Sequence, residues 1–212
     1  MEMSVEQAAD ALGLSGRRVR AMAAAGKLPA RRIGRAWIVD VTDHSPPRYP
    51  GRPLSARSAW GVLGLGEDRL SRSERRRALD RRAKLGEAPP GMLANRAAAH
   101  RFRAHPGLLG QLAADPRLLA SGVSAAGRYR ADIIALGELE AYVRAEDIES
   151  IEHEYALREP RDGVRPNVVL RTPQPDWPFR DGVEAAPLLV VAADLLDAGD
   201  ERSVRAAREL FS

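Results

Sequence analysis

Cysteine is absent from the chain, and this absence excludes disulfide bonds and thiolate-ligated metal sites. Long apolar runs are absent as well, since no stretch reaches the roughly 18 residues that a membrane-spanning helix requires. The N-terminal residues carry acids where a secretory signal peptide carries bases and a long apolar run. We therefore expect a soluble, cytoplasmic protein without a membrane segment. Its 212 residues suit one domain or two small ones.

Lysine is nearly absent, because arginine supplies 31 of the 33 basic residues and the lysines are Lys27 and Lys84. A nuclease of the D…ExK type needs a lysine beside its carboxylates, and neither lysine lies in such a setting. His153 lies between Glu152 and Glu154, but consecutive helix positions point in different directions and cannot converge on one ion. We therefore expect no catalytic residues, no metal and no cofactor, and predict that the protein is not an enzyme.

Acidic residues are scarce in the first part of the chain. Residues 1–131 hold 11 acidic and 24 basic residues, a net charge of +13, whereas residues 132–212 hold 18 acidic and 9 basic ones, a net charge of −9. A strongly basic N-terminal part points to a polyanion as its partner. Solubility alone could account for the acidic part.

The most strongly basic segment, residues 15–37, contains seven basic residues and no acidic one. A capping box at Ser4 and Gln7 predicts a short helix before this segment. Ser15 then suits the N-cap of a second helix, and Gly26 suits its C-terminal end. Gly13-Leu14 would form a short turn between the two helices. Two short helices joined by such a turn make a helix-turn-helix.

The second helix would present its basic side chains outward. Val19, Met22 and Ala23 lie on its predicted inward face, whereas Arg17, Arg18 and Arg20 lie on the opposite one. Basic residues are unfavourable in a first helical turn, where the macrodipole is positive, and a bound phosphate would relieve this conflict. Small residues between the arginines would let the helix enter the major groove, where arginine pairs with guanine edges. A solvated basic face is the alternative interpretation.

Two short strands joined by a tight turn at Gly34 are predicted after the second helix. Ile33 and Trp37 would pack under the helices, and the arginines would line an exposed ribbon able to contact phosphates or the minor groove. The predicted DNA-contacting residues are Ser15, Arg17, Arg18, Arg20, Lys27, Arg31, Arg32 and Arg35.

The residues of this segment resemble the excisionase/MerR-type winged helix-turn-helix over residues 3–42. The resemblance implies a DNA-binding domain. Alanine occupies positions 21, 24 and 25, where the family often has larger polar residues, so base contacts would rest on Arg17, Arg18 and Arg20. The matching strings are Leu12-Gly13-Leu14-Ser15, Gly26-Lys27-Leu28-Pro29-Ala30 and Ile33-Gly34 with Trp37.

Four prolines lie in residues 44–55, which predicts an extended, semi-stiff linker. This linker separates the predicted winged helix-turn-helix domain, residues 1–43, from the rest of the chain. The remainder divides into a basic helical segment, residues 56–115, and an α+β domain, residues 116–212.

The basic helical segment contains one helix that is rich in arginine. A capping box at Ser71 and Glu74 opens this helix, which runs to about residue 85. Its arginines could form a second phosphate-contacting surface or an ordinary solvated face, with Leu79 and Ala83 as a thin apolar side. The candidate phosphate contacts are Arg72, Arg75 and Arg76.

The pattern of apolar residues predicts an α+β fold, with a small N-terminal winged helix-turn-helix, a helical segment and then a domain with a small mixed sheet. Glycine and proline mark most of the element ends. Helices are expected at residues 56–65, 92–102, 106–114, 145–155, 187–198 and 201–211, and strands at residues 118–123, 139–143, 155–158 and 168–172.

Residues 100–212 contain five short strings that follow the predicted order of elements. The strings are Arg101-Phe102-Arg103-Ala104-His105-Pro106, Ala120-Ser121-Gly122-Val123-Ser124-Ala125-Ala126, Leu139-Glu140-Ala141-Tyr142-Val143, Val168-Val169-Leu170-Arg171 and Ala193-Asp194-Leu195-Leu196-x-Ala198-Gly199-Asp200-x-Arg202. In these strings and in the order of its elements, the chain resembles the AbiE-type antitoxins. Those proteins pair an N-terminal winged helix with an α+β domain and repress their own operon.

This second resemblance implies the antitoxin and autorepressor of a bacterial toxin–antitoxin or phage-defence locus. Its partners would be double-stranded operator DNA and a nucleotidyltransferase-like toxin. The alternatives are a stand-alone transcriptional regulator and an excisionase-like architectural protein, both of which would also bind DNA. The oligomeric state stays open at this stage.

Overall fold

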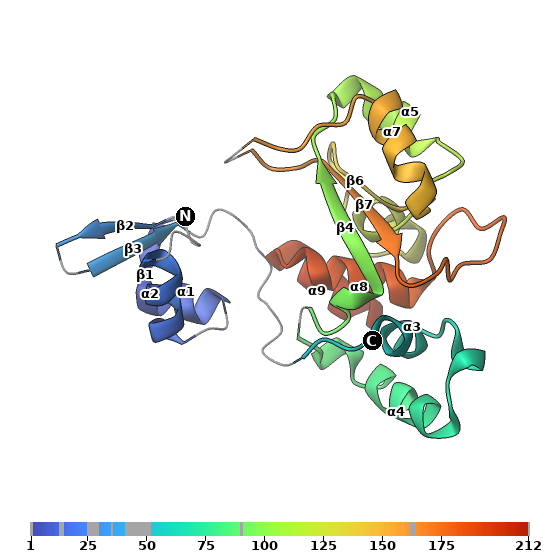
Figure 1. The fold of residues 1–212 in the computed structure, drawn as a ribbon, viewed down its shortest axis with the longest axis horizontal. Helices are drawn as coiled ribbons and strands as arrows, with labels where there is room; N and C mark the ends of the chain where they lie inside the picture. Colours follow the sequence, from blue (N-terminus) through green and yellow to red (C-terminus); the bar gives the residue numbers. More distant parts are fainter. Residues whose placement is uncertain are drawn as a thin grey trace. The chain divides into compact units, whose positions relative to one another are not determined.

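A computed structural model describes residues 2–12, 15–24, 30–34, 36–40, 52–89, 91–161 and 164–211. The chain divides into two compact units, Met1–Arg52 and Pro53–Ser212 (Figure 1). Each unit has a hydrophobic core of its own, and the α+β fold class is confirmed.

The first unit combines two short helices with a three-stranded antiparallel sheet. The strands have the spatial order β1-β3-β2, with β3 in the centre. The bounds are β1 (Glu2–Ser4), α1 (Val5–Leu12), α2 (Gly16–Ala24), β2 (Ala30–Ile33) and β3 (Ala36–Asp40).

A small apolar core holds the helices of the first unit on its sheet. Val5 and Ala8 of α1, Val19 of α2 and Val39 of β3 are buried side by side, and Trp37 packs against them at partial exposure. Burial of this apolar face stabilises helices that are too short to persist alone in water.

The second unit is built on a four-stranded mixed sheet with the order β4-β7-β6-β5. Strands β6 and β7 are parallel, and the two outer pairs are antiparallel. The bounds are α3 (Ala56–Val62), η1 (Glu67–Arg69), α4 (Arg72–Arg82), η2 (Leu85–Glu87), η3 (Ala94–Arg96), β4 (Ala97–Phe102), η4 (Pro106–Leu108), α5 (Leu109–Ala113), β5 (Leu119–Ala120), α6 (Gly122–Ala126), η5 (Gly127–Tyr129), β6 (Leu139–Tyr142), η6 (Ala145–Asp147), α7 (Ile148–Glu154), β7 (Val168–Pro173), α8 (Leu188–Ala198) and α9 (Glu201–Phe211).

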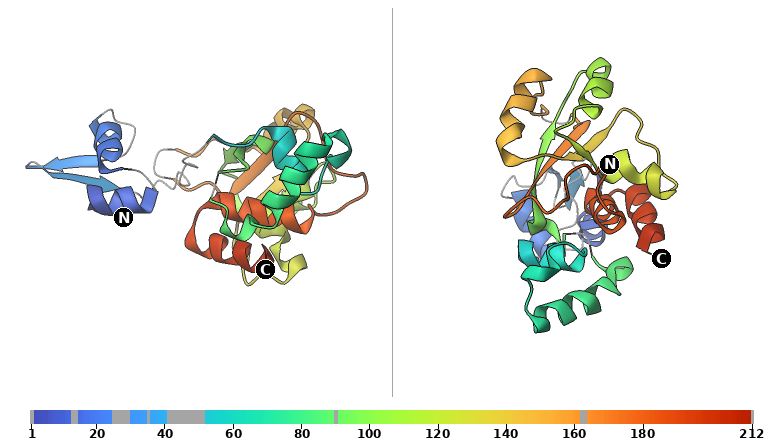
Figure 2. Two further views of the ribbon diagram at one scale, coloured as in Figure 1. Left: turned by 90° about the horizontal axis from the view of Figure 1, so that it is seen from below. Right: turned by 90° about the vertical axis from the view of Figure 1, so that its right-hand side faces the viewer.

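The sheet of the second unit separates two hydrophobic cores. One face packs against α3, α6, α8 and α9, and Tyr142 lies in this core beside Trp60 and Phe179. The other face packs against α5 and α7, through Leu112 and Ile151. Figure 2 shows the sheet between α7 and the α8–α9 pair.

One expected helix is a strand in the structure. The sequence predicts a helix over residues 92–102, and alanine, which is frequent there, has the highest helix propensity. The segment instead forms the short turn η3 and the strand β4, in which every residue from Ala97 to Phe102 pairs with β7. Tertiary pairing with β7 therefore overrides the local preference of Ala97-Ala98-Ala99.

Four other expectations need adjustment. The strand expected at residues 118–123 shrinks to β5, because Gly122 begins α6, and the one expected at residues 155–158 reduces to a bridge between Arg158 and Arg103. The spacing of Leu188, Val191, Ala192, Leu195 and Leu196 predicts an amphipathic helix with one apolar face. Helix α8 is instead buried almost all round from Val190 to Leu196, and its first residue, Leu188, is exposed. The basic helical segment and the α+β domain, which were predicted to divide at residue 115, share one sheet and one core.

Candidate DNA-binding surface and a buried charged network

The two helices of the first unit begin at side-chain caps, as predicted. The Ser4 amide donates to Gln7 Oε1 at 2.9 Å, and the Gln7 amide donates to Ser4 Oγ at 3.2 Å. The Arg18 amide donates to Ser15 Oγ at 3.3 Å. Ser15 therefore satisfies one of the free amides at the start of α2 and fixes where this helix begins.

The arginines of α2 lie on its exposed face. Val19 is fully buried and Ala23 is 7% exposed, so this side of α2 is anchored to the core. Arg17, Arg18 and Arg20 are exposed. Because the first turn contains no acidic residue, Arg17 and Arg18 stand at the positive end of the helix dipole without a compensating carboxylate on that turn.

Arg20 differs from the other two arginines because it has an ion-pair partner. Its Nη2 atom donates to Oε1 of Glu6 on α1 at 2.8 Å, with side chains 54% and 72% exposed. Such an exposed pair contributes at most about 1 kcal/mol. A phosphate could displace Glu6, but Arg20 is a weaker candidate for base contact than Arg17 and Arg18.

The hairpin of the first unit presents its arginines to two sides. Arg31 and Arg32 of β2 are both exposed, and Gly34 provides the turn with a φ of +59°. Arg32 pairs across the ladder with Trp37, and Arg31 pairs with Ile38. Successive strand residues point to opposite faces, so the two arginines do not lie on one face.

Part of the predicted DNA-contacting set has no described position. Lys27 and Arg35 lie outside the described residues, as do the predicted helix end at Gly26 and the turn at Gly13. The side chain of Ile33 is not described either. The structure therefore places Ser15, Arg17, Arg18, Arg20, Arg31 and Arg32 of the predicted set.

The basic helix α4 begins at the predicted capping box. The Glu74 amide donates to Ser71 Oγ, and the Ser71 amide donates to Glu74 Oε2 at 2.8 Å. Arg72 and Arg76 are exposed. Arg75 is exposed too, but its Nη2 donates to the Glu67 carbonyl at 3.1 Å, so part of its donor capacity is used within the protein.

The apolar contact of α4 differs from the one expected. Leu79 is 50% exposed and Ala83 is exposed, whereas Ala78 is the buried residue of this helix. Arg82 links the helix to the C-terminal end of α3, because its Nε and Nη2 donate to the carbonyls of Val62 and Gly61 at 2.7 and 2.8 Å. The helix is therefore held by a few polar contacts and is solvated along most of its length.

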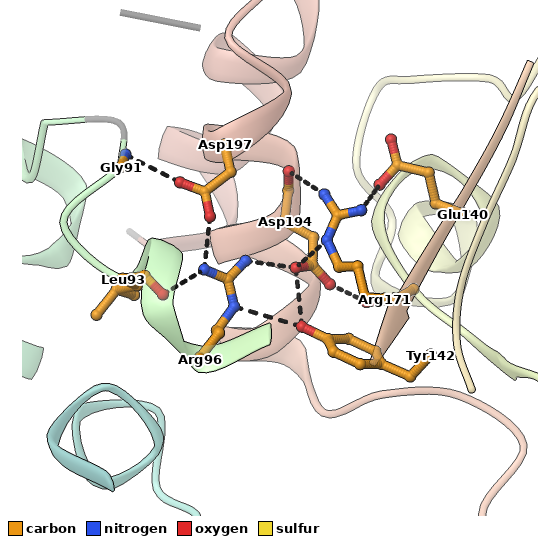
Figure 3. Close-up of polar contacts among 9 residues, drawn as sticks. Gly91, Leu93, Arg96, Glu140, Tyr142, Arg171, Asp194 and Asp197 are labelled. Carbon is orange, nitrogen blue, oxygen red and sulfur yellow. Dashed lines mark hydrogen bonds and ion pairs between the residues drawn. The ribbon is translucent and has the colours of Figure 1, made fainter. Parts of the chain in front are cut away.

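A network of buried charged side chains, which sequence reasoning missed, lies between the sheet and α8 (Figure 3). Asp194 of α8 is fully buried at its centre. It accepts from Arg96, from Arg171 Nε at 3.0 Å and from the Tyr142 hydroxyl at 2.9 Å, and Ser121 donates to its second oxygen. Side chains from four elements or turns thus converge on this one carboxylate of α8.

Electrostatics keep the centre of this network charged. Burial raises the pKa of Asp194, but the nearby Arg171 and Arg96 outweigh burial, and the net pKa is lowered. Burial also lowers the pKa of Arg96, but Asp197, Tyr142 and Asp194 raise it well above its usual value. The Tyr142 pKa is raised by burial and by Asp194, so its hydroxyl stays protonated and donates.

Asp197 closes the network at its outer end. Its carboxylate accepts from Arg96 Nη1 and from the Gly91 amide at 3.0 Å, and its side chain is 20% exposed. Arg96 Nη1 also donates to the Leu93 carbonyl at 3.0 Å. Arg96 is 1% exposed, and its guanidinium therefore has hydrogen-bond partners on several sides, as burial of a charge requires.

Glu140 lies in the part of the network where hydrogen bonding is least complete. Its Oε2 lies 3.4 Å from Arg171 Nη1, within ion-pair range, but neither atom makes a hydrogen bond within the described structure. Burial raises the pKa of Glu140 to about 7, against the opposing effect of Arg171. Gly122, with a φ of +47°, leaves room for this carboxylate, since a Cβ there would lie 2.0 Å from Oε2.

The surroundings of His153 are described, and the expectation that the protein binds no metal stays a prediction. Within the described residues, no group of three or more His, Cys, Asp or Glu side chains could hold a metal ion. Glu154 is instead paired with Arg117 at 2.6 Å, and Arg117 also binds the carboxylate of Asp115. The absence of enzymatic activity stays a prediction.

Comparison with known proteins identifies the N-terminal unit. A family described as "Helix-turn-helix domain" matches residues 2–43. No curated protein and no solved structure matches the chain. The chain therefore carries an N-terminal helix-turn-helix domain, a class of domain that indicates DNA binding. No helix within the described ranges is long and apolar enough to cross a membrane.

Proposed function

We propose that the protein binds operator DNA sequence-specifically through its first unit and represses transcription of the locus that encodes it. The observation that carries this proposal is the exposure of Arg17 and Arg18 in the first turn of α2, whose opposite face is fixed by Val19 and Ala23. Helix N-termini and guanidinium groups both attract phosphate and base-edge acceptors. The proposal requires no catalysis, metal or cofactor.

The residues of the first unit divide into two roles in this proposal. Arg17 and Arg18 supply specificity, because an arginine at the start of a recognition helix can reach guanine O6 and N7 in the major groove. Arg31 and Arg32 supply affinity through phosphates, which carry no sequence information. Arg20 contributes after release from Glu6, at the small energy that an exposed ion pair represents.

We further infer that the second unit makes the protein the antitoxin of a toxin–antitoxin or phage-defence locus. The resemblance to AbiE-type antitoxins supports this inference through residues distant in sequence. Four of the five resembling strings supply members of the buried network: Ser121, Glu140, Tyr142, Arg171 and Asp194. Strings that meet at one place in the fold point to a shared architecture more strongly than isolated matches do.

The DNA-binding proposal can be tested with single arginine substitutions. Fluorescence anisotropy would measure binding to the DNA upstream of the coding sequence and to a scrambled duplex. We expect Arg17→Ala or Arg18→Ala to cost about 1–3 kcal/mol on the upstream DNA and to reduce the preference over the scrambled duplex. Arg32→Ala should weaken both duplexes alike.

Arg180→Ala provides the matched control, because it removes an exposed arginine from the second unit. This variant should bind as the unaltered protein does. Equal losses for Arg180→Ala and Arg17→Ala would mean that net charge, rather than α2, directs binding, and the proposal for α2 would be wrong.

The antitoxin role needs a separate experiment. The gene for a neighbouring nucleotidyltransferase-like protein would be expressed alone, with the full chain, and with the Arg17→Ala variant. We expect the full chain to restore growth, and the variant to restore it when its expression is driven from an unrelated promoter. Unchanged growth arrest with the full chain would contradict the antitoxin role and leave DNA binding unaffected.

A further inference from the structure

Strand β4 is an outer strand of the sheet in the second unit, so one of its sides carries backbone groups that no neighbouring strand uses (Figure 1). The direction of these groups follows from the bonds at both ends of the strand. The Gln174 amide donates to the Arg96 carbonyl at 2.7 Å, and the Asn167 amide donates to the Phe102 carbonyl at 3.1 Å. Arg96 and Phe102 therefore direct their carbonyls toward the β7 side.

Backbone groups along a strand alternate in direction, so Ala98 and His100 also face β7. Ala97, Ala99 and Arg101 then direct their amides and carbonyls outward. The same alternation continues beyond the strand, where Arg103 exchanges two bonds with Arg158 at 2.7 and 3.1 Å on the outer side. Within the described part of the chain, the outward amides and carbonyls of these three residues make no backbone hydrogen bond to another segment.

The side chains of β4 also allow another strand to approach its outer side closely. Ala98 and Ala99 are exposed on opposite faces of the sheet, and their methyl groups leave the backbone accessible from both faces. The strand contains no proline, and its one charged residue is Arg101. Proline, bulges and several charges are the devices that usually prevent an edge strand from pairing.

We propose that β4 pairs with β4 of a second copy of the chain in an antiparallel arrangement with its two-fold axis at Ala99. Ala99 would lie opposite Ala99, and Ala97 opposite Arg101 of the other copy. Every outward residue then meets an outward residue, giving on the order of six hydrogen bonds across the axis. The two sheets would join into one continuous sheet.

Charge, as well as geometry, favours a second copy of the chain as the partner of β4. Arg101 of the second copy would stand beside Ala97, next in the chain to Arg96. Asp197, one of the two carboxylate partners of Arg96, lies at the outer end of the buried network. Its side chain is 20% exposed, so it can also face Arg101 of the second copy. The two copies of Arg101 would lie on opposite sides of the axis, separated by four strand residues, or about 14 Å.

The absence of cysteine allows a direct test of this register in the full chain. Opposed residues of a hydrogen-bonded antiparallel pair have Cα atoms about 5.5 Å apart, within the range of a disulfide. We expect Ala99→Cys to form a covalent dimer under mild oxidation. Ala83→Cys, at an exposed alanine on the basic helix, should remain monomeric on the same gel.

A proline substitution tests the same edge without a cross-link. Ala99→Pro removes an outward amide and leaves the ladder to β7 intact, whereas Ala98→Pro removes an amide directed at β7. Sedimentation should show a concentration-dependent dimer for the unaltered chain and a folded monomer for Ala99→Pro. Ala98→Pro should lower the melting temperature instead. If Ala99→Pro unfolds, Ala99→Glu serves, because it opposes two like charges at the axis.

The pairing does not depend on the proposed repressor or antitoxin role, since each measurement reads only the association of the chain with itself. Two outcomes would overturn it. One is a chain that sediments as a monomer at every concentration. The other is an Ala99→Cys variant that cross-links no faster than Ala83→Cys.

Discussion

The buried carboxyl of Glu140 should make the stability of the second unit depend on pH in an unusual direction. Most acidic residues of folded proteins stabilise the fold as pH rises, because ion pairs lower their pKa. Glu140 has its pKa raised from 4.5 to about 7, first by burial. Between these two values the folded chain binds more protons than the unfolded chain, so the free energy of unfolding falls as pH rises.

The size of the effect follows from the same two pKa values. A shift of this size corresponds to about 3 kcal/mol in all, of which about 2 kcal/mol falls between pH 5.5 and pH 8.5. The stabilisation is complete below pH 4.5 and is lost as pH rises through 7. Glu140→Gln keeps the shape of the side chain and removes its titration, so the variant should lack this component.

Urea unfolding of the full chain and the variant at pH 5.5 and 8.5 would measure the difference. We expect the variant to gain about 2 kcal/mol relative to the unaltered chain on going to pH 8.5. Other titrating groups are common to both chains and cancel. Glu184→Gln, at an exposed position, serves as the control and should follow the unaltered chain. A stability difference for Glu140→Gln that is constant with pH would refute this account of the buried pair.

Three further substitutions test other parts of the structure. Gly122→Ala should destabilise the second unit by about 2–4 kcal/mol in urea unfolding, because its Cβ would meet the Glu140 carboxylate at 2.0 Å and its φ is +47°. Glu6→Gln should tighten binding to upstream DNA in anisotropy titrations, since it releases Arg20 and removes a negative charge; unchanged or weaker binding would exclude this role for the pair. Arg76→Ala should reduce the slope of log K against log salt by about 1 if α4 touches phosphates, and should leave it unchanged if α4 is only solvated.

The helix-turn-helix could be predicted from the sequence because its signals are local. The bonds between Ser4 and Gln7 and between Ser15 and Arg18 span three residues each, and short-range patterns predict such caps well. Helix α9 was predicted for the same reason, since Asp200 caps it through the Ser203 amide at 3.0 Å. Local signals of this kind do not depend on the rest of the fold.

Strand β4 and the buried network could not be predicted in this way. The alanines of β4 favour a helix locally, and only pairing with β7 makes them a strand. The network joins Arg96 to Asp194, 98 positions apart, so its formation depends on the tertiary topology. One signal was available: Asp194 interrupts the apolar run of α8, and a charge at such a position usually has a buried partner.

In the proposed function, α2 enters the DNA at a defined site near the protein's own gene. An affinity-cleavage experiment tests it most directly, because the chain has no cysteine and a single one can carry an iron–EDTA cleaving group. Ala21→Cys would place this group on the exposed face of α2. We expect cuts clustered at one site in the upstream DNA, whereas cuts spread evenly along the duplex would contradict sequence-specific binding through α2.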